Sequence, residues 1–248
     1  MVVIRAVGVG GRGARAALLS ASSPSSQVTN LARRRMSVRA ESLSPDPEDR
    51  TKPLKVAALC GSLRRASYNR GLLRSAIAIC KESIPGMHIE YIDIEPLPFL
   101  NTDLEVDKKF PPVVESFRKK IQEADSVLFA SPEYNYSVTG MLDSGFQLGA
   151  PLKNAIDWAS RSPNVWADKP AAIVSAGGSL GGARSQYHLR QIGVFLDLHF
   201  INKPELYIRA FEPPRKFDDD GNLIDEGERE KLKKVLLSLQ AFSLRLKA

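Results

Sequence analysis

The chain has 248 residues, of which 43% are hydrophobic and 25% charged, as is typical of a globular protein with one sizeable core. Of its 35 basic residues, seven are arginines in residues 1–40, a stretch without acidic residues. The remaining 28 basic residues are balanced by 28 acidic ones, so the net charge of +7 gives no support for nucleic-acid binding. No apolar run approaches the roughly 18 residues that indicate a membrane span.

Residues 1–40 resemble a targeting peptide, because they are rich in arginine and serine and the first acidic residue is Glu41. They lack the compact apolar segment of a secretory signal, which argues against export. Residues 37–40, Ser-Val-Arg-Ala, resemble the sites where plastid transit peptides are cut. We therefore expect a chloroplast location, with a mitochondrion or the cytoplasm as alternatives. Residues 41–53 carry three prolines among charges and predict a linker.

The rest of the chain alternates between strand and helix patterns. Strands are expected at residues 54–59, 88–94, 126–130, 171–176 and 206–208, and helices at residues 69–81, 113–124, 152–161, 183–196 and 225–246. This alternation is typical of a parallel sheet that helices cover on both faces. The sequence thus predicts a single α/β domain, residues 54–248, built on a flavodoxin-like, doubly wound, five-stranded parallel sheet.

The loop after the first expected strand carries short polar groups just before a helix. Ser62, Arg64, Ser67 and Asn69 lie where the free N–H groups and the dipole of a helix N-terminus favour phosphate. The Lys-Ser/Thr ending of a P-loop is absent, so a single phosphomonoester fits better than a triphosphate with Mg²⁺. Alternatively, Ser67 or Asn69 simply caps the helix.

Two further loops follow later strands and are expected at the same edge of the sheet, where ligands bind in open α/β folds. Residues 131–137, Ser-Pro-Glu-Tyr-Asn-Tyr-Ser, hold two tyrosines, an asparagine and a carboxylate behind a restricting proline. Residues 177–182 contain four glycines, which allow the backbone to lie flat against a planar ligand. The plainer interpretations are tyrosines packed on the sheet and a flexible turn.

Four segments together resemble the NADPH-dependent FMN reductase family, and within it the plant NADPH:quinone oxidoreductase branch. They are CGSLRRASYN at 60–69, SPEYNYSVTG at 131–140, PLKNAIDW at 151–158 and the glycine loop at 177–182. The resemblance covers about residues 54–246. It implies a flavodoxin-like fold, noncovalent FMN, NADPH or NADH as hydride donor, a small quinone as acceptor, and a homodimer or homotetramer.

The resemblance also assigns residues to the cofactor. It implies that Ser62, Arg64, Ser67 and Asn69 hold the FMN phosphate. The ribityl chain and the isoalloxazine would be bordered by Pro132, Glu133, Tyr134, Asn135 and Tyr136, and Gly177 and Gly178 would approach the polar edge of the ring. No catalytic side chain and no metal are expected, because the cofactor carries the redox chemistry. The three histidines lack ligand spacing, and Cys60 and Cys80 are expected to be buried thiols.

One departure from the family is a ten-residue insertion, residues 141–150, between Gly140 and Pro151. The sequence allows three interpretations of this insertion: a surface bulge, a lid whose Phe146 narrows the acceptor pocket, or a defect that damages the site. A bulge is favoured because loop-closure entropy grows slowly with length. We nevertheless expect weaker FMN binding than in a variant that lacks these residues.

The expected function is two-electron hydride transfer from NADPH through FMN N5 to a quinone. An FMN reductase or azoreductase, a flavin-binding electron carrier without a small substrate, and a variant inactivated by the insertion are the alternatives. A carrier that docks on basic partners is commonly acidic, whereas residues 41–248 are charge-balanced. The charge balance therefore favours an enzyme.

Overall fold

The computed structural model describes residues 52–138 and 151–247. Its central sheet is wholly parallel, with the order β2-β1-β3-β6 and a fifth position shared by β7 and β8. The strands are β1 (Leu54–Cys60), β2 (Met87–Tyr91), β3 (Ser126–Ala130), β6 (Pro170–Gly177), β7 (His199–Phe200) and β8 (Leu206–Arg209). The predicted doubly wound parallel sheet is confirmed, but the sheet has six strands because β7 and β8 pair with successive parts of β6.

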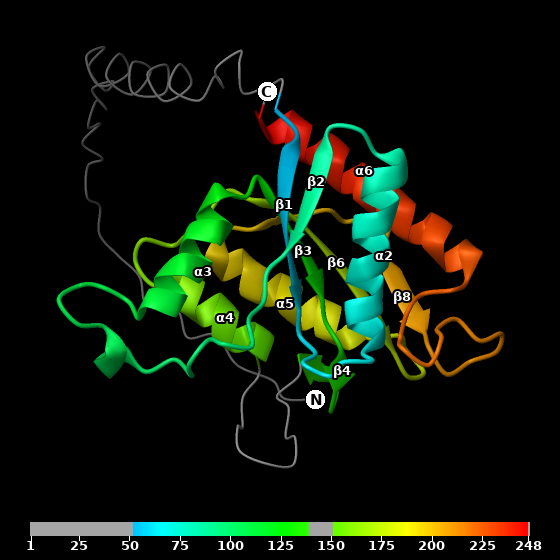
Figure 1. The fold of residues 1–248 in the computed structure, drawn as a ribbon, viewed down its shortest axis with the longest axis horizontal. Coiled ribbons are helices and arrows are strands. Elements are labelled where there is room, and N and C mark those ends of the chain that lie inside the picture. The colour runs from blue at the N-terminus through cyan, green and yellow to red at the C-terminus, as the bar shows by residue number, and fades with distance from the viewer. Residues whose placement is uncertain (1–51, 139–150, 248) are drawn as a thin grey trace, which may run out of the picture. The chain divides into compact units, whose positions relative to one another are not determined.

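Helices cover both faces of this sheet (Figure 1). They are α2 (Tyr68–Ser83), α3 (Pro112–Glu123), α4 (Pro151–Ser160), α5 (Ala183–Leu196) and α6 (Glu226–Lys247), with a short 3-10 helix, η1 (Thr102–Leu104). All five predicted helices are confirmed, whereas the strand expected at 88–94 begins one residue earlier and ends at Tyr91. In residues 52–138 and 151–247, no helix has the length and apolar character needed to span a bilayer.

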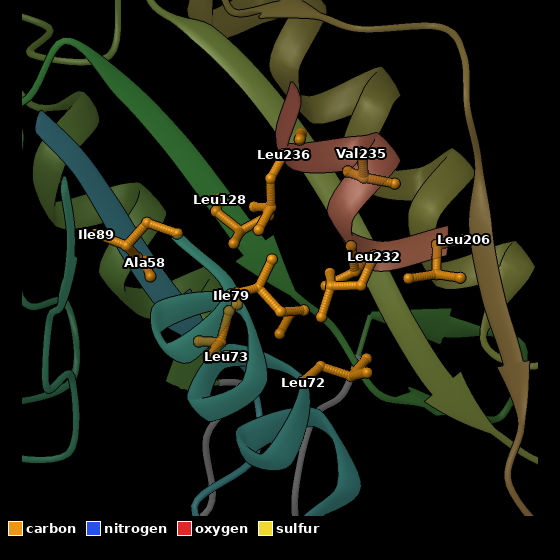
Figure 2. Close-up of a cluster of buried hydrophobic side chains, with 14 of the residues drawn as sticks. Ala58, Leu72, Leu73, Ile79, Ile89, Leu128, Leu206, Leu232, Val235 and Leu236 are labelled. Atoms are coloured by element: carbon orange, nitrogen blue, oxygen red, sulfur yellow. The ribbon is translucent and has the colours of Figure 1, made fainter. Parts of the chain in front are cut away.

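The two faces of the sheet form two separate hydrophobic cores, because successive strand residues point to opposite sides. Val56 and Ala58 of β1 face α2 and α6, whereas Ala57 and Leu59 face α3, α4 and α5. Figure 2 shows the first core, where leucines of α2 and α6 meet over the sheet. Burial on both faces explains why these strands read as nearly continuous apolar runs.

The register of the sheet brings the carboxyl ends of its central strands together. Cys60 pairs with Ala130, and Ala130 pairs with Val174. The first backbone groups beyond the strands continue this alignment, since Gly61 N donates to Ala130 O at 2.8 Å and Ser131 N donates to Val174 O at 3.1 Å. The loops after β1, β3 and β6 therefore begin side by side at one edge, as predicted.

Candidate functional site

The first loop surrounds the N-terminus of α2 with hydroxyl and guanidinium groups. Ser67 is the N-cap of α2, and its Oγ accepts a hydrogen bond from Arg70 N at 3.4 Å. Ser62 is buried, whereas Arg64 is exposed and its guanidinium lies 5.6 Å from the centre of the Tyr68 ring. Capping uses only an acceptor of Ser67, so its hydroxyl proton is available to an anion. Capping and phosphate binding are therefore compatible here.

Asn69 joins the first loop to the third. Its Nδ2 donates to Ala176 O at 2.9 Å, and its Oδ1 accepts from Ala176 N at 3.0 Å. The side chain is buried, and Ala176 directly precedes the glycine loop. Direct contact of Asn69 with a phosphate stays a prediction, whereas the structure shows its amide bridging two chain segments that form the site.

The second loop contains a small antiparallel hairpin that the sequence analysis did not anticipate. Its strands are β4 (Glu133–Tyr134) and β5 (Ser137–Val138). Asn135 and Tyr136 form the two-residue turn with φ values of 49° and 63°, the signs that a type I′ turn requires. Tyr134 and Tyr136 are 56% and 66% exposed, so they do not pack into the sheet.

Glu133 ties this hairpin to α5. Its Oε2 accepts hydrogen bonds from Arg184 N at 2.8 Å and Ser185 N at 3.4 Å, and its Oε1 lies 3.4 Å from Arg184 Nη1. The N-cap position of α5 is Gly182, which has no side chain to cap the helix. Glu133 thus supplies from another loop the acceptor and the negative charge that a helix N-terminus favours.

The third loop uses its glycines in two different ways. Gly181 and Gly182 have φ values of 60° and 90°, and a Cβ on Gly182 would lie 2.6 Å from Ser175 Cβ. These two glycines are therefore required by the backbone path and by close packing. A Cβ on Gly178 would meet no atom within 4 Å. The space above Gly178 is open, as a planar ligand needs.

A cavity of about 410 Å³, called here the first cavity, lies where the three loops meet. It is lined by Ser62, Arg64, Ser67, Tyr68, Asn69, Pro132, Glu133, Tyr134, Ala176, Gly177, Gly178 and Phe211. All the predicted site residues line it except Asn135 and Tyr136, which line a neighbouring second cavity of about 530 Å³. The structure thus brings the predicted residues together in two adjoining cavities that share Glu133 and Gly178.

Three side chains of these cavities were missed by the sequence analysis. Tyr68 and Phe211 line the first cavity with ring centres 5.9 Å apart, and Arg184 lines the second. Phe211 follows β8, so applying the carboxyl-edge rule to the fifth strand position would have found it. Arg184 lies in the first turn of α5 beside the glycine loop, but its contact with Tyr136 depends on tertiary structure.

The donors of the first cavity fit a flat ligand with one phosphate. Ser62, Ser67 and Arg64 gather at the α2 N-terminus and suit the phosphate. The open face over Gly178 and the ring of Tyr134 suit a planar group. The volume lies within the roughly 300–1,000 Å³ of typical small-molecule sites. The residues present therefore fit FMN.

Histidines and cysteines of the described residues contribute little to this cavity. His188 Nδ1 is 2.9 Å from Ser137 Oγ, on the outer side of α5. His199 has ligand atoms within 4.8 Å of those of Asp168 and Asp197, but it pairs with Pro170 at the amino edge of the sheet. Burial raises the pKa of the Cys60 thiol to about 11, so this residue is a neutral thiol whose Sγ accepts from Ser62 N.

The fold and the site define an α/β protein with a cavity that suits a flat, phosphorylated ligand at the carboxyl edge of a parallel sheet. The family model described as NADPH-dependent FMN reductase matches residues 54–212. The chain belongs to this family.

Relatives and a solved structure agree with this assignment. The chain is 70% identical over 194 residues to the NAD(P)H:quinone oxidoreductase of Solanum tuberosum, a match that covers 78% of this chain and 95% of that protein. It is 69% identical over 196 residues to the NADPH:quinone oxidoreductase of Arabidopsis thaliana, covering 79% and 95%. The solved flavoenzyme NAD(P)H:(acceptor) oxidoreductase of Paracoccus denitrificans is 30% identical with a TM-score of 0.62, covering 78% of this chain and 97% of that one.

Proposed function

We propose that the chain is an FMN-dependent NAD(P)H:quinone oxidoreductase. The observation that carries the proposal is one cavity lined by all three predicted loops, with phosphate donors at one end and an open glycine face at the other. Family membership and the names of the plant relatives support the same activity. When bound, FMN would supply the redox chemistry, which is two-electron transfer from NAD(P)H to the quinone.

The protein's contribution is binding, orientation and charge. Ser62, Ser67 and Arg64 hold the phosphate, and the glycine loop offers backbone N–H groups toward the ring. Among the described residues that line this cavity, Glu133 is the one carboxylate, and its charge is compensated by Arg184 and by the N-terminus of α5. Negative charge on FMN would therefore be repelled only weakly by the Glu133 carboxylate.

One set of measurements on the full chain distinguishes the enzyme from the electron carrier, the inactive variant and the FMN reductase or azoreductase. An enzyme binds FMN and oxidises NADPH continuously when a benzoquinone is supplied, at a rate that added FMN increases. A carrier supports only stoichiometric reduction, and an inactive variant stays colourless. A preference for free FMN or an azo dye over the quinone would favour the FMN reductase or azoreductase alternative.

Arg64 allows a matched test of the phosphate site. Arg64 and Arg65 are adjacent exposed arginines, but only Arg64 lines the first cavity. Arg64→Gln should weaken FMN binding about tenfold, because a charge-assisted hydrogen bond is lost, while Arg65→Gln should bind FMN like the wild type. FMN fluorescence quenching measures both. Equal affinities of the two variants would contradict the assignment of Arg64.

We also propose a homodimer or homotetramer. Val194 and Phe195 are 81% and 87% exposed on α5, an apolar pair that a second copy would cover. Light scattering after size-exclusion chromatography should give the mass of two or four chains, and Phe195→Glu should lower it. A monomeric wild type would reject this proposal.

We further propose that residues 1–40 are a chloroplast transit peptide and residues 41–53 a linker to the reductase domain at 54–248. The arginine-rich, acid-free composition of residues 1–40 and the plant origin of the relatives support this. A fusion of residues 1–53 to a fluorescent protein should enter plastids. Import into mitochondria, or retention in the cytoplasm, would reject the assignment.

A further inference from the structure

Arg70 connects the first loop to the end of β2. Its Nε and Nη2 donate to the Tyr91 hydroxyl at 3.3 and 3.1 Å, and its Nη1 donates to Leu63 O at 3.3 Å. Its guanidinium carbon also lies 5.8 Å from the centre of the Tyr91 ring. One planar fork of donors thus bridges a strand end and a loop carbonyl, and all three residues are partly buried.

The bridge reaches the first loop between two residues of the first cavity. Ser62 and Arg64, on either side of Leu63, both line that cavity. The Leu63–Arg64 peptide is trans and planar, so the bond from Arg70 to Leu63 O also fixes the direction of the Arg64 N–H. Arg70 itself is not among the described residues that line the cavity, so it acts on a ligand there through the loop or through its charge.

Helix stability does not account for a cation at this position. Arg70 is the third residue of α2, and the first turn of a helix disfavours positive side chains because of the helix dipole. This turn contains no acidic residue that could balance the charge. The hydrogen bonds to Tyr91 and Leu63 are what Arg70 contributes here, and both act on the segment that leads into the helix.

We propose that Arg70 is a positioning residue for the FMN phosphate: anchored on Tyr91, it holds Leu63 O and so presets the backbone of the loop to which the phosphate binds. This inference rests on the proposed function, because it places FMN in the first cavity. A loop that is already ordered loses less conformational freedom on binding, so the bridge strengthens phosphate binding without touching the phosphate. Riboflavin, which lacks the phosphate, gains nothing from the bridge.

Arg70→Met tests the proposal, with Arg190→Met as the matched control. Arg190 also combines a carbonyl bond with a ring contact, since its Nη1 donates to Ile201 O at 3.0 Å and its guanidinium carbon lies 5.4 Å from the centre of the Phe200 ring. Phe200 pairs with Ala171 near the start of β6, at the amino edge of the sheet. Methionine keeps the apolar stem and removes the donors at both positions.

The measurement compares the affinities of the full chain, freed of FMN, for FMN and for riboflavin by fluorescence quenching. Arg70→Met should bind FMN about tenfold more weakly, the size of one charge-assisted hydrogen bond, and should bind riboflavin like the wild type. Arg190→Met should keep the wild-type affinity for both flavins. Tyr91→Phe keeps the ring and removes the hydroxyl, so FMN binding alone should weaken about threefold.

Arg70→Lys separates positioning from charge. Lysine keeps the positive charge but has no planar fork with which to reach Tyr91 and Leu63 together. This variant should therefore bind FMN as weakly as Arg70→Met does. Wild-type FMN affinity in Arg70→Lys would show that the charge alone is responsible and would overturn the proposal.

Two further results would overturn it. One is an equal loss of FMN and riboflavin affinity in Arg70→Met, which a purely structural role predicts, and the other is equal FMN affinity in Arg70→Met and Arg190→Met. If Arg70→Met does not fold, the milder Tyr91→Phe decides, because unchanged FMN affinity there would contradict the anchoring of Arg70. Failure of the proposed function itself is distinguishable, since the wild type would then bind no FMN or reduce no quinone.

Discussion

Cys60 illustrates how burial at a single residue makes stability depend on pH. It ends β1 directly before the first loop, and burial raises the pKa of its thiol from 9.0 to about 11. Below pH 9 the thiol is protonated in the folded and the unfolded chain, and its contribution to stability is complete. Between pH 9 and 11 the unfolded chain releases the proton and the folded chain keeps it, so the free energy of unfolding falls as pH rises.

We predict that this fall amounts to about 2–3 kcal/mol at most. Cys60→Ala should lower stability at pH 8 through the lost packing but should flatten the profile between pH 9 and 11. Urea unfolding of both proteins at several pH values measures the difference. Parallel profiles would show that the Cys60 thiol is not the responsible group.

Glu133 gives a second prediction at the scale of one residue. Glu133→Ala removes the acceptor for two backbone N–H groups of α5 and the ion pair with Arg184. We expect a loss of about 1–3 kcal/mol in the free energy of unfolding, together with weaker FMN binding, because the hairpin is no longer joined to the start of α5, which follows the glycine loop. Glu133→Gln keeps one acceptor and should fall between the wild type and the alanine variant.

The control for Glu133 is Glu212→Ala, which removes a half-exposed ion pair with Arg209. Such surface pairs contribute about 0–1 kcal/mol, so this variant should retain stability and FMN affinity. Denaturant unfolding and FMN titration are measured on all of these proteins. FMN affinity that is unchanged in Glu133→Ala would show that the hairpin and α5 keep their positions without this bridge.

At the scale of elements, α2 is packed against the turn before α6 through a glycine. A Cβ on Gly71 would lie 1.7 Å from the carbonyl oxygen of Gly221, a backbone atom that cannot turn aside. The turn is also tied to α2 by Arg74, which donates to Asn222 Oδ1 at 2.7 Å and to Asp220 O at 3.0 Å. Close approach at Gly71 thus determines where this turn can lie.

Gly71→Ala should therefore destabilise the fold by about 1–3 kcal/mol or more, even though alanine is the better helix former. Gly86→Ala is the contrasting case. Gly86 has a φ of 75°, but the nearest atom to its added Cβ is 3.8 Å away. That variant should lose only about 1–2 kcal/mol of stability, which is the cost of placing an alanine in the left-handed region. Thermal and urea unfolding compare the two, and a smaller loss in Gly71→Ala would contradict the packing argument.

Local patterns were sufficient to predict most elements but not the shortest ones. The long helices have clear periodicity, the buried strands are nearly continuous apolar runs, and the structure confirms both. β7 escaped prediction because it has two residues and exists only by pairing with Pro170 and Ala171. The hairpin β4–β5 escaped prediction because its turn places a tyrosine at positive φ, which tyrosine seldom adopts.

The place of the site was predictable, while its internal contacts were not. Parallel strands put their carboxyl ends at one edge, so the three loops could be brought together from the sequence. The bonds between the loops join Asn69 to Ala176 across 107 positions and Glu133 to Arg184 across 51. No local pattern encodes such pairs, since they depend on how the whole sheet assembles.

At the scale of the whole molecule, the insertion at residues 141–150 is the departure from the expected family pattern. It lies outside the described residues, between β5 and α4, which are described on either side. We predict that a variant lacking residues 141–150 binds FMN more tightly than the wild type, because the family resemblance implies that Gly140 leads directly into Pro151. FMN titration of the two proteins is the measurement. Equal affinities would show that the insertion is a tolerated bulge without effect on the cofactor.

The Asn69 bridge has a consequence for how the protein acquires its cofactor. Because the amide is bonded to the main chain of Ala176, the loops after β1 and β6 are joined by the protein itself. These two loops are therefore already held in place before FMN binds. Protein that has been stripped of FMN should consequently be restored by simple mixing, without passing through an unfolded state.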